Sequence, residues 1–291
     1  MKKDKSINVI YIAGNGHSGS TLLDIILGSN DECFSAGELK AITRDTIMQE
    51  YCSCKKIISD CEVWSEVIQL WQANCEVDYQ QYQNLRLRFE RNKSTLRTLF
   101  NRMWPSNDFD KYCEATLQLF QALRKVTGKS VIIDSSKSPQ RIAVLSRIVD
   151  LRVIHLCRDF TGVLNSAKKS SSKDIKAGIE KDNPASRTWK VVVDWIVTNI
   201  ATEIFCIGVN SSKVFYKNYV HNPESLRGIH PLMDQINGKE SFSTSHMLAG
   251  NIIRLKKDLK INPNVGFQYK RLNNNQRALA KVMDKLFAYW T

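Results

Sequence analysis

Short apolar segments alternate with longer helix-compatible stretches along the chain. Four segments have the length and composition of buried strands, at residues 7–13, 130–134, 151–156 and 213–216. Helical patterns lie between them, among them residues 21–28, which end on a glycine, and about 185–205. Short apolar strands separated by helices predict an α/β fold with a central parallel sheet flanked by helices on both faces.

Two segments depart from this pattern. Residues 62–125 are polar, aromatic and helix-compatible without a glycine or a strand signal, which predicts a helical insert over the sheet. Residues 168–184 are rich in serine and lysine and predict a mobile loop. With 291 residues, 43% of them apolar, we expect a single domain over 1–291 that contains both segments.

The charge balance favours an anionic partner. Forty-two Lys and Arg against 29 Asp and Glu give a formal net charge of +13. Such a charge attracts nucleic acid, an acidic membrane surface or a phosphorylated cofactor, and also fits a merely solvated basic surface. The first apolar stretch, residues 7–13, is too short for a membrane span or a convincing signal peptide. We therefore expect a cytoplasmic protein with reduced thiols and no stable membrane insertion.

Three of the eight cysteines fall within ten residues: Cys52, Cys54 and Cys61. Together with Cys75 or a histidine they have the residue types of a zinc site. The C-x-C spacing differs from the usual C-x-x-C knuckle, so the sequence leaves open whether these thiols bind anything.

A glycine-rich loop follows the first predicted strand and precedes a helix. Residues 14–21 read G-N-G-H-S-G-S-T and match the phosphate loop G-x-x-x-x-G-K-[ST] except that Ser20 replaces the lysine. That lysine reaches the β- and γ-phosphates of a nucleoside triphosphate, so its loss disfavours triphosphate cleavage. Backbone N–H groups and the positive end of the following helix still favour a bound anion.

A second group of polar residues follows the predicted strand at 151–156. Arg158 lies directly after this strand, and Ser166 lies two helical turns farther on. Ligands bind at the carboxyl edge of open α/β sheets, and a guanidinium recognises phosphate through two hydrogen bonds. These two residues are candidates for a second phosphate, although by themselves they also fit a surface Arg158–Asp159 pair and an ordinary helix serine.

Together these two segments resemble the sulfotransferases that use 3′-phosphoadenosine 5′-phosphosulfate (PAPS). The family's loop R-S-G-[ST]-T-L corresponds to residues 17–22, and its R-D-x-x-x-x-x-x-S motif corresponds to Arg158, Asp159 and Ser166. Residues 215–223 resemble R-Y-E-D-L-x-x-x-P, and residues 250–254 resemble the G-N-x-x-R element of bacterial members. The stretch around Cys52, Cys54 and Cys61 is similar to a cysteine and tryptophan segment of those members, which disfavours zinc.

The resemblance implies that PAPS is the co-substrate and assigns residues to it. The 5′-phosphosulfate would be held by Gly16, Ser18, Gly19, Ser20 and Thr21. The 3′-phosphate would be held by Arg158 and Ser166, with Arg254 as a possible addition.

The resemblance also implies catalytic residues. His17 replaces the usual Arg or Lys beside the bridging oxygen, so either a protonated His17 or Lys137 would stabilise the leaving phosphate. Glu38, in A-G-E-L, corresponds to the glutamate of the G-E-E segment of tyrosylprotein sulfotransferases and would be the general base, with a raised carboxylate pKa. Its alternative role is a helix-capping carboxylate. Sulfonyl transfer by in-line displacement requires no metal.

Two other functions remain open at this point. A P-loop kinase or NTPase would use Asp134 as its magnesium ligand. A nucleic-acid-binding protein would use the net charge and the basic and aromatic residues at Phe267, Tyr269, Lys270 and Arg271. The acceptor of a sulfonyl group, expected between the helical insert and the loop at 168–184, is equally compatible with a small molecule, a lipid, a saccharide or a peptide.

Overall fold

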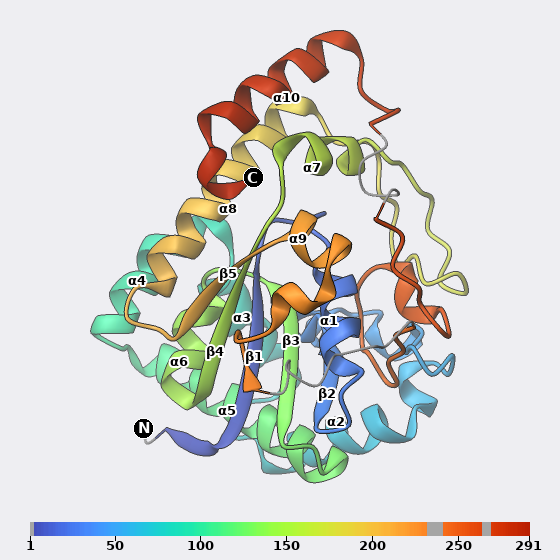
Figure 1. Ribbon diagram of the computed structural model, residues 1–291. Helices are drawn as coiled ribbons and strands as arrows, with labels where there is room; N and C mark the ends of the chain where they lie inside the picture. The colour runs from blue at the N-terminus through green and yellow to red at the C-terminus, as the bar shows by residue number, and fades with distance from the viewer. Residues whose placement is uncertain (1–2, 232–240, 264–268) are drawn as a thin grey trace.

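Five strands form one parallel sheet at the centre of the computed structural model, which describes residues 3–231, 241–263 and 269–291 (Figure 1). The strand order is β2-β3-β1-β4-β5, and each neighbouring pair is parallel. The strands are β1 (Asp4–Gly14), β2 (Cys33–Gly37), β3 (Val131–Lys137), β4 (Val149–Cys157) and β5 (Ser211–Phe215). The predicted parallel sheet is confirmed.

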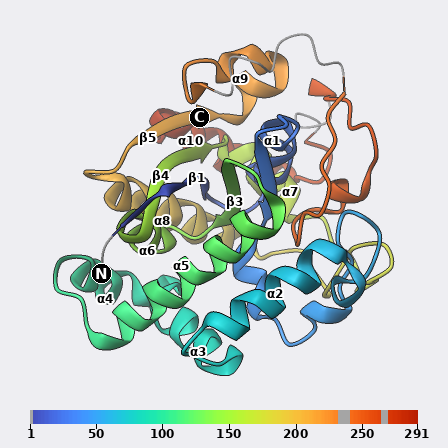
Figure 2. The ribbon, with the colours of Figure 1, turned by 90° about the horizontal axis from the view of Figure 1, so that it is seen from below.

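Helices cover both faces of this sheet, as the view from below shows (Figure 2). Their bounds are α1 (Ser20–Gly28), α2 (Glu62–Asn74), α3 (Tyr79–Phe89), α4 (Thr95–Met103), α5 (Asn107–Thr127), α6 (Arg141–Ile148), α7 (Phe160–Ala167), α8 (Thr188–Cys206), α9 (Tyr216–His221) and α10 (Asn274–Leu286). None of the helices among the described residues is both long and apolar enough to cross a membrane.

Alternating side chains of β1 build the two layers of the core. Val9 and Tyr11 pack into one cluster with residues of α2, α5 and α6, whereas Ile10 and Ile12 pack into another with residues of α1 and α9. Successive side chains of a strand point to opposite faces, so a strand covered on both sides is apolar throughout. This explains why β1 is a continuous apolar run rather than an alternating pattern.

The segment predicted as a helical insert contains α2, α3, α4 and α5. Trp71 of α2 donates its indole N–H to the carbonyl of Ala115 in α5 at 2.9 Å, and its ring packs edge-on against Tyr82 of α3. The segment between α7 and α8, all of it described, contains only two isolated bridges, Ser171–Asn183 and Asp174–Ile179. Its mobility stays a prediction.

The sequence pattern missed one strand, β2. Its residues, Cys-Phe-Ser-Ala-Gly, include no β-branched side chain and form a short strand at the edge of the sheet. The strand is nevertheless buried along its whole length. It matters for function because the candidate base Glu38 follows it directly.

Candidate active site

The carboxyl ends of β1, β3 and β4 meet at one edge of the sheet. Ala13 of β1 pairs with Lys137 of β3, and Gly14 pairs with Leu156 of β4. The glycine-rich loop therefore leaves the sheet between the segment after β3 and the segment after β4 (Figure 1). Ligands of open α/β sheets bind at this edge.

The glycine-rich loop has the backbone of an anion cradle. His17 and Gly19 adopt the left-handed conformation, with φ of 67° and 91°, and α1 begins at Ser20. The first N–H groups of a helix have no partner within the helix and lie at its positive end. A Cβ atom at Gly19 would lie 2.5 Å from the Tyr219 hydroxyl, so no larger residue fits there. The buried Ser18 hydroxyl has no hydrogen-bond partner among the described residues.

Arg158 and Ser166 meet the loop from the side of β4 and α7. One terminal nitrogen of Arg158 donates to the carbonyl of His17 at 2.8 Å, and the Ser166 hydroxyl lies 3.2 Å from Nδ1 of His17. The guanidinium of Arg158 lies 4.0 Å from the ring centre of Tyr216. The two residues proposed for one phosphate thus lie beside the loop proposed for the other.

The surroundings of His17 disfavour its charged form. Partial burial of the imidazole, followed by the positive charges of Lys137 and Arg158, lowers the pKa of His17, even though the residue keeps part of its surface exposed to solvent. A lowered pKa disfavours a protonated His17 and so favours Lys137 as the cation beside the leaving phosphate, and the choice between the two stays a prediction.

Glu38 lies between two lysines on the other side of the loop. Its carboxylate accepts a hydrogen bond from the ammonium of Lys137, and the ammonium of Lys40 lies 3.8 Å away. Burial by itself would raise the pKa of Glu38, but Lys137 and Lys40 outweigh it and lower this pKa to about 2. The expected raised pKa of Glu38 is therefore wrong, because the sequence did not show that both lysines face this carboxylate.

Lys137 has an unusual backbone for a lysine. Its φ of 69° lies in the left-handed region, which is unfavourable for a residue with a side chain. Such strain persists only where the surrounding structure imposes it, and it is enriched at functional sites. Here it directs the side chain of Lys137 from the end of β3 to Glu38.

Arg254 is held by other parts of the protein. It is buried, forms an ion pair with Glu180, and donates to the carbonyl of Gly250 at 2.8 Å and to that of Tyr51 at 3.2 Å. Its role at the 3′-phosphate stays a prediction. It holds the segment before α8 against the turn that follows Gly250.

That turn packs on the glycine-rich loop. The backbone N–H of Asn251 donates to the Thr21 hydroxyl at 3.0 Å, and the backbone N–H of Glu38 donates to the carbonyl of Ala249 at 3.3 Å. The G-N-x-x-R element therefore helps to position the loop and the candidate base.

Three further residues contact the site but were not predicted from the sequence: Tyr216, Tyr219 and Lys40. Tyr216 lies under the Arg158 guanidinium, and the Tyr219 hydroxyl donates to the carbonyl of Gly19 at 3.0 Å. Both tyrosines fall within the segment that resembles R-Y-E-D-L-x-x-x-P, so that motif held the available signal. Lys40 has no comparable signal in the sequence.

A large cavity borders the Arg158 side of the site. It has a volume of about 730 Å³. Four cations and two carboxylates contribute to its lining, namely Lys217, Lys270, Arg277, Lys281, Asp159 and Asp284. Asp159, the residue after Arg158, lines this cavity, whose cations have the chemistry to bind further polar groups of an anionic ligand.

Asp134, the magnesium ligand that a kinase would need, is fully buried. Its carboxylate accepts from Nε of Arg141 at 2.6 Å and from the Ser136 hydroxyl at 2.5 Å. A carboxylate paired in this way inside the core is not placed to bind a solvated metal ion. Of the residues weighed for a nucleic-acid interface, Phe267 lies outside the described residues.

Comparison with known proteins gives structural neighbours only. No protein-family model and no curated protein matches this chain. Among solved structures, the sulfotransferase domain of the Synechococcus PCC 7002 olefin synthase has 13% identity and a TM-score of 0.46, covering 96% of this chain and 95% of that one. A sulfotransferase domain of the curacin biosynthetic pathway has 16% identity and a TM-score of 0.45, covering 97% and 91%.

The sulfotransferase STF9 of Mycobacterium avium has 10% identity and a TM-score of 0.44, covering 99% of this chain and 76% of that one. All three are sulfotransferases. At identities of 16% or less, none of these neighbours assigns a role to a residue of this chain.

Proposed function

We propose that this chain is a sulfotransferase that transfers the sulfonyl group of PAPS to a hydroxyl or amine acceptor. The observation that carries the proposal is the arrangement around the lysine-free phosphate loop. Arg158 and Ser166 contact one side of it, and the Lys137–Glu38 pair lies at the end of the neighbouring strand β3. A donor with two separate anionic groups and a transferable sulfonyl group fits these features.

The donor would be held by groups that this chain supplies. The backbone of Gly16 to Thr21 and the Ser18 hydroxyl would bind the 5′-phosphosulfate, and the unpartnered state of that buried hydroxyl supports this role. Arg158 and Ser166 would bind the 3′-phosphate. The nucleoside would extend to the cavity beside Asp159.

Lys137 would have two successive partners in this mechanism. Without the donor it pairs with Glu38 and keeps that carboxylate a weak base, with a pKa of about 2. A bound phosphosulfate would attract the same ammonium, and burial would then raise the pKa of Glu38 toward that of a useful base. Donor binding would in this way prepare the base as well as the leaving group.

The transfer itself conserves atoms and charge. The acceptor oxygen or nitrogen attacks sulfur in line with the bridging oxygen, and its proton passes to Glu38. The bond between sulfur and the bridging oxygen breaks, and its electron pair leaves on 3′-phosphoadenosine 5′-phosphate, where Lys137 stabilises the developing charge. No step requires a metal.

The acceptor would enter beside the segment at residues 168–184. Glu180 of this segment pairs with Arg254, which binds the carbonyl of Gly250 in the turn that packs on Thr21 and Glu38. These contacts support the prediction that this segment borders the acceptor pocket. A small-molecule, lipid, saccharide or peptide acceptor is compatible with it.

Calorimetric titration with 3′-phosphoadenosine 5′-phosphate, and separately with Mg-ATP, tests the donor. We expect tight binding of the bisphosphate, little binding of Mg-ATP, and PAPS-dependent sulfation of one member of an acceptor panel without added magnesium. Preferential binding of Mg-ATP would replace the proposal with a kinase or NTPase. Salt-sensitive retention on nucleic acid with no nucleotide binding would replace it with the nucleic-acid function.

A further inference from the structure

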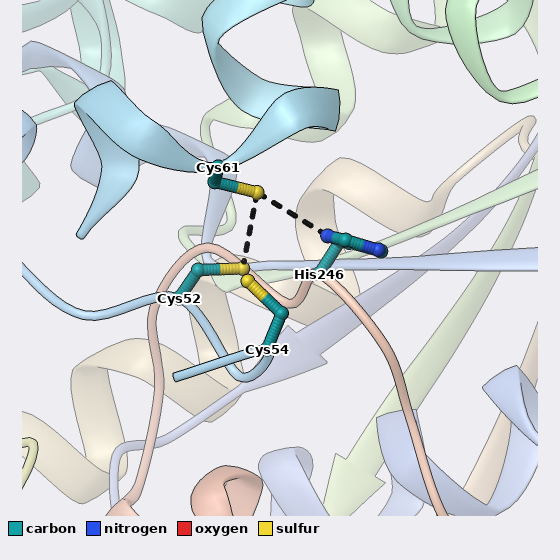
Figure 3. Close-up of side chains that lie close together, drawn as sticks. All are labelled: Cys52, Cys54, Cys61 and His246. Atoms are coloured by element: carbon teal, nitrogen blue, oxygen red, sulfur yellow. Dashed lines mark hydrogen bonds between the residues drawn. The ribbon is translucent and has the colours of Figure 1, made fainter. Parts of the chain in front are cut away.

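Four metal-ligating side chains converge at a place separate from the phosphate loop. They are Cys52, Cys54, Cys61 and His246, and their ligand atoms all lie within 4.8 Å of one another (Figure 3). Cys52 and Cys54 lie in the turn closed by the Tyr51–Ile57 bridge, and Cys61 immediately precedes α2. His246 comes from a segment 185 residues farther along the chain than Cys61.

Two distances within the cluster are close to those between ligands of one tetrahedral ion. The sulfurs of Cys52 and Cys61 are 3.7 Å apart, and Nδ1 of His246 lies 3.2 Å from the Cys61 sulfur. Tetrahedral zinc, with Zn–S of about 2.3 Å and Zn–N of about 2.0 Å, separates two sulfurs by about 3.8 Å and a sulfur and a nitrogen by about 3.5 Å. A disulfide requires an S–S distance of about 2.0 Å, and all these cysteines are free.

Backbone hydrogen bonds hold the two segments together around the cluster. The N–H of Met247 donates to the Ser53 hydroxyl at 2.8 Å, and the N–H of Ser53 donates to the carbonyl of Met247 at 3.1 Å. The indole of Trp64 donates to the carbonyl of His246 at 2.5 Å. His246 itself has a φ of 63°, an unfavourable conformation that brings its ring to the thiols.

We propose that Cys52, Cys54, Cys61 and His246 bind one structural zinc ion. Three thiolates and one imidazole complete a tetrahedral shell from protein ligands alone, which is typical of structural rather than catalytic zinc. Cys52 and Cys61 are fully buried, whereas Cys54 and His246 are half-buried. Cys75, the other cysteine weighed as a ligand, ends α2 at a distance of about 20 Å along the helix from Cys61.

The ion would fix the segment that follows His246 and packs against the candidate active site. From His246 the chain continues to Leu248, whose N–H donates to the carbonyl of Ala36 at 3.1 Å, and then to the turn that packs on Thr21 and Glu38. The zinc site would therefore anchor this segment to the start of the helical insert. The proposed zinc site does not depend on the proposed sulfotransferase activity.

Metal analysis of the reduced protein tests the site directly. We expect about one zinc per chain in the wild type and in Cys75→Ser, a matched control at a half-buried cysteine outside the cluster. Cys54→Ser, which changes a half-buried ligand without opening the core, should bind zinc at least tenfold more weakly. Equal zinc content and affinity in Cys54→Ser and the wild type would overturn the assignment.

Cobalt titration of the wild-type apoprotein provides a test that does not depend on the folding of a variant. One equivalent of Co²⁺ should produce the sulfur-to-metal charge-transfer bands and the intense visible bands of a tetrahedral thiolate site. Folded, fully reduced apoprotein that takes up neither Co²⁺ nor Zn²⁺ would overturn the proposal. The proposal would also be overturned if the protein is isolated with a Cys52–Cys61 disulfide and still binds no metal after that disulfide has been reduced.

Discussion

The ammonium of Lys137 is hydrogen-bonded to the carboxylate of Glu38, so that the last residue of β3 and the first residue after β2 form one charged pair. Glu38 has 14% and Lys137 18% of its side chain exposed, so water weakens their attraction only in part. The pKa of Glu38, the proposed base, therefore depends on Lys137, the cation proposed to stabilise the leaving group.

Replacing the base should affect turnover but not product binding. Glu38→Gln removes the proton acceptor while keeping the size of the side chain, so we expect the rate of PAPS-dependent transfer to fall by roughly 100-fold or more. Affinity for 3′-phosphoadenosine 5′-phosphate, measured by calorimetry, should remain nearly unchanged. Glu66→Gln, at an exposed position of α2, is the control and should match the wild type. A preserved rate in Glu38→Gln would exclude Glu38 as the base.

Removing the ammonium of Lys137 should raise the pKa of Glu38. Because Lys137 lowers the pKa of Glu38 against the effect of burial, Lys137→Met should raise this pKa above about 2. Carbon NMR titration of the glutamate carboxylates, with Glu38→Gln used for assignment, measures the change. Lys40→Met should give a smaller increase because its ammonium lies 3.8 Å from the carboxylate. An unchanged pKa in Lys137→Met would mean that the pair is not formed in solution.

Arg158 should contribute to affinity for the bisphosphate product. Arg158→Ala removes a charged hydrogen-bonding group, and we expect a loss on the order of 2 kcal/mol, or roughly 30-fold in Kd. Arg97→Ala, at an exposed position of α4, removes the same charge elsewhere and is the control. Calorimetry at constant ionic strength gives both values. Equal weakening in the two variants would indicate a general effect of net charge rather than a contact with phosphate.

Asp24 should make the free energy of unfolding depend on pH. Burial raises the pKa of Asp24 to about 7, outweighing the hydroxyls of Ser135 and Ser35, which both lie 2.5 Å from its carboxylate. From pH 5 to 7 the folded protein retains a proton that the unfolded chain has released. The stabilisation present below the unfolded pKa is therefore lost as pH rises toward 7, by about 2 kcal/mol over this range.

Asp24→Asn should lack this part of the pH dependence, because an amide does not titrate. Urea unfolding of both proteins at pH 5, 6 and 7 measures the difference in the free energy of unfolding. We expect the wild type to lose stability relative to Asp24→Asn as pH rises. A difference that does not change with pH would mean that Asp24 is already ionised in the folded protein at pH 5.

The parallel sheet and the loop at its edge could be predicted from the amino-acid sequence. Strands buried on both faces are apolar throughout, so β1, β3 and β4 were legible as short apolar runs. The edge strand β5 was legible only from its shorter apolar part, and β2 was missed because it contains no β-branched residue. Arg158 and Ser166 were found for a related reason. All strands of a parallel sheet end at the same edge, so residues that follow a strand lie near that edge. Arg158 and Ser166 both follow β4.

The charge environment of the site and its long-range partners depend on how the chain folds. The low pKa of Glu38 depends on two lysines that face it from different segments, and the fourth side chain of the cysteine cluster, His246, comes from a distant part of the chain. The ion pair of Arg254 with Glu180 likewise joins segments that are distant in the sequence. Electrostatic interactions and metal ligation depend on distances of a few ångströms between side chains, and a linear pattern specifies such distances only for residues within one element.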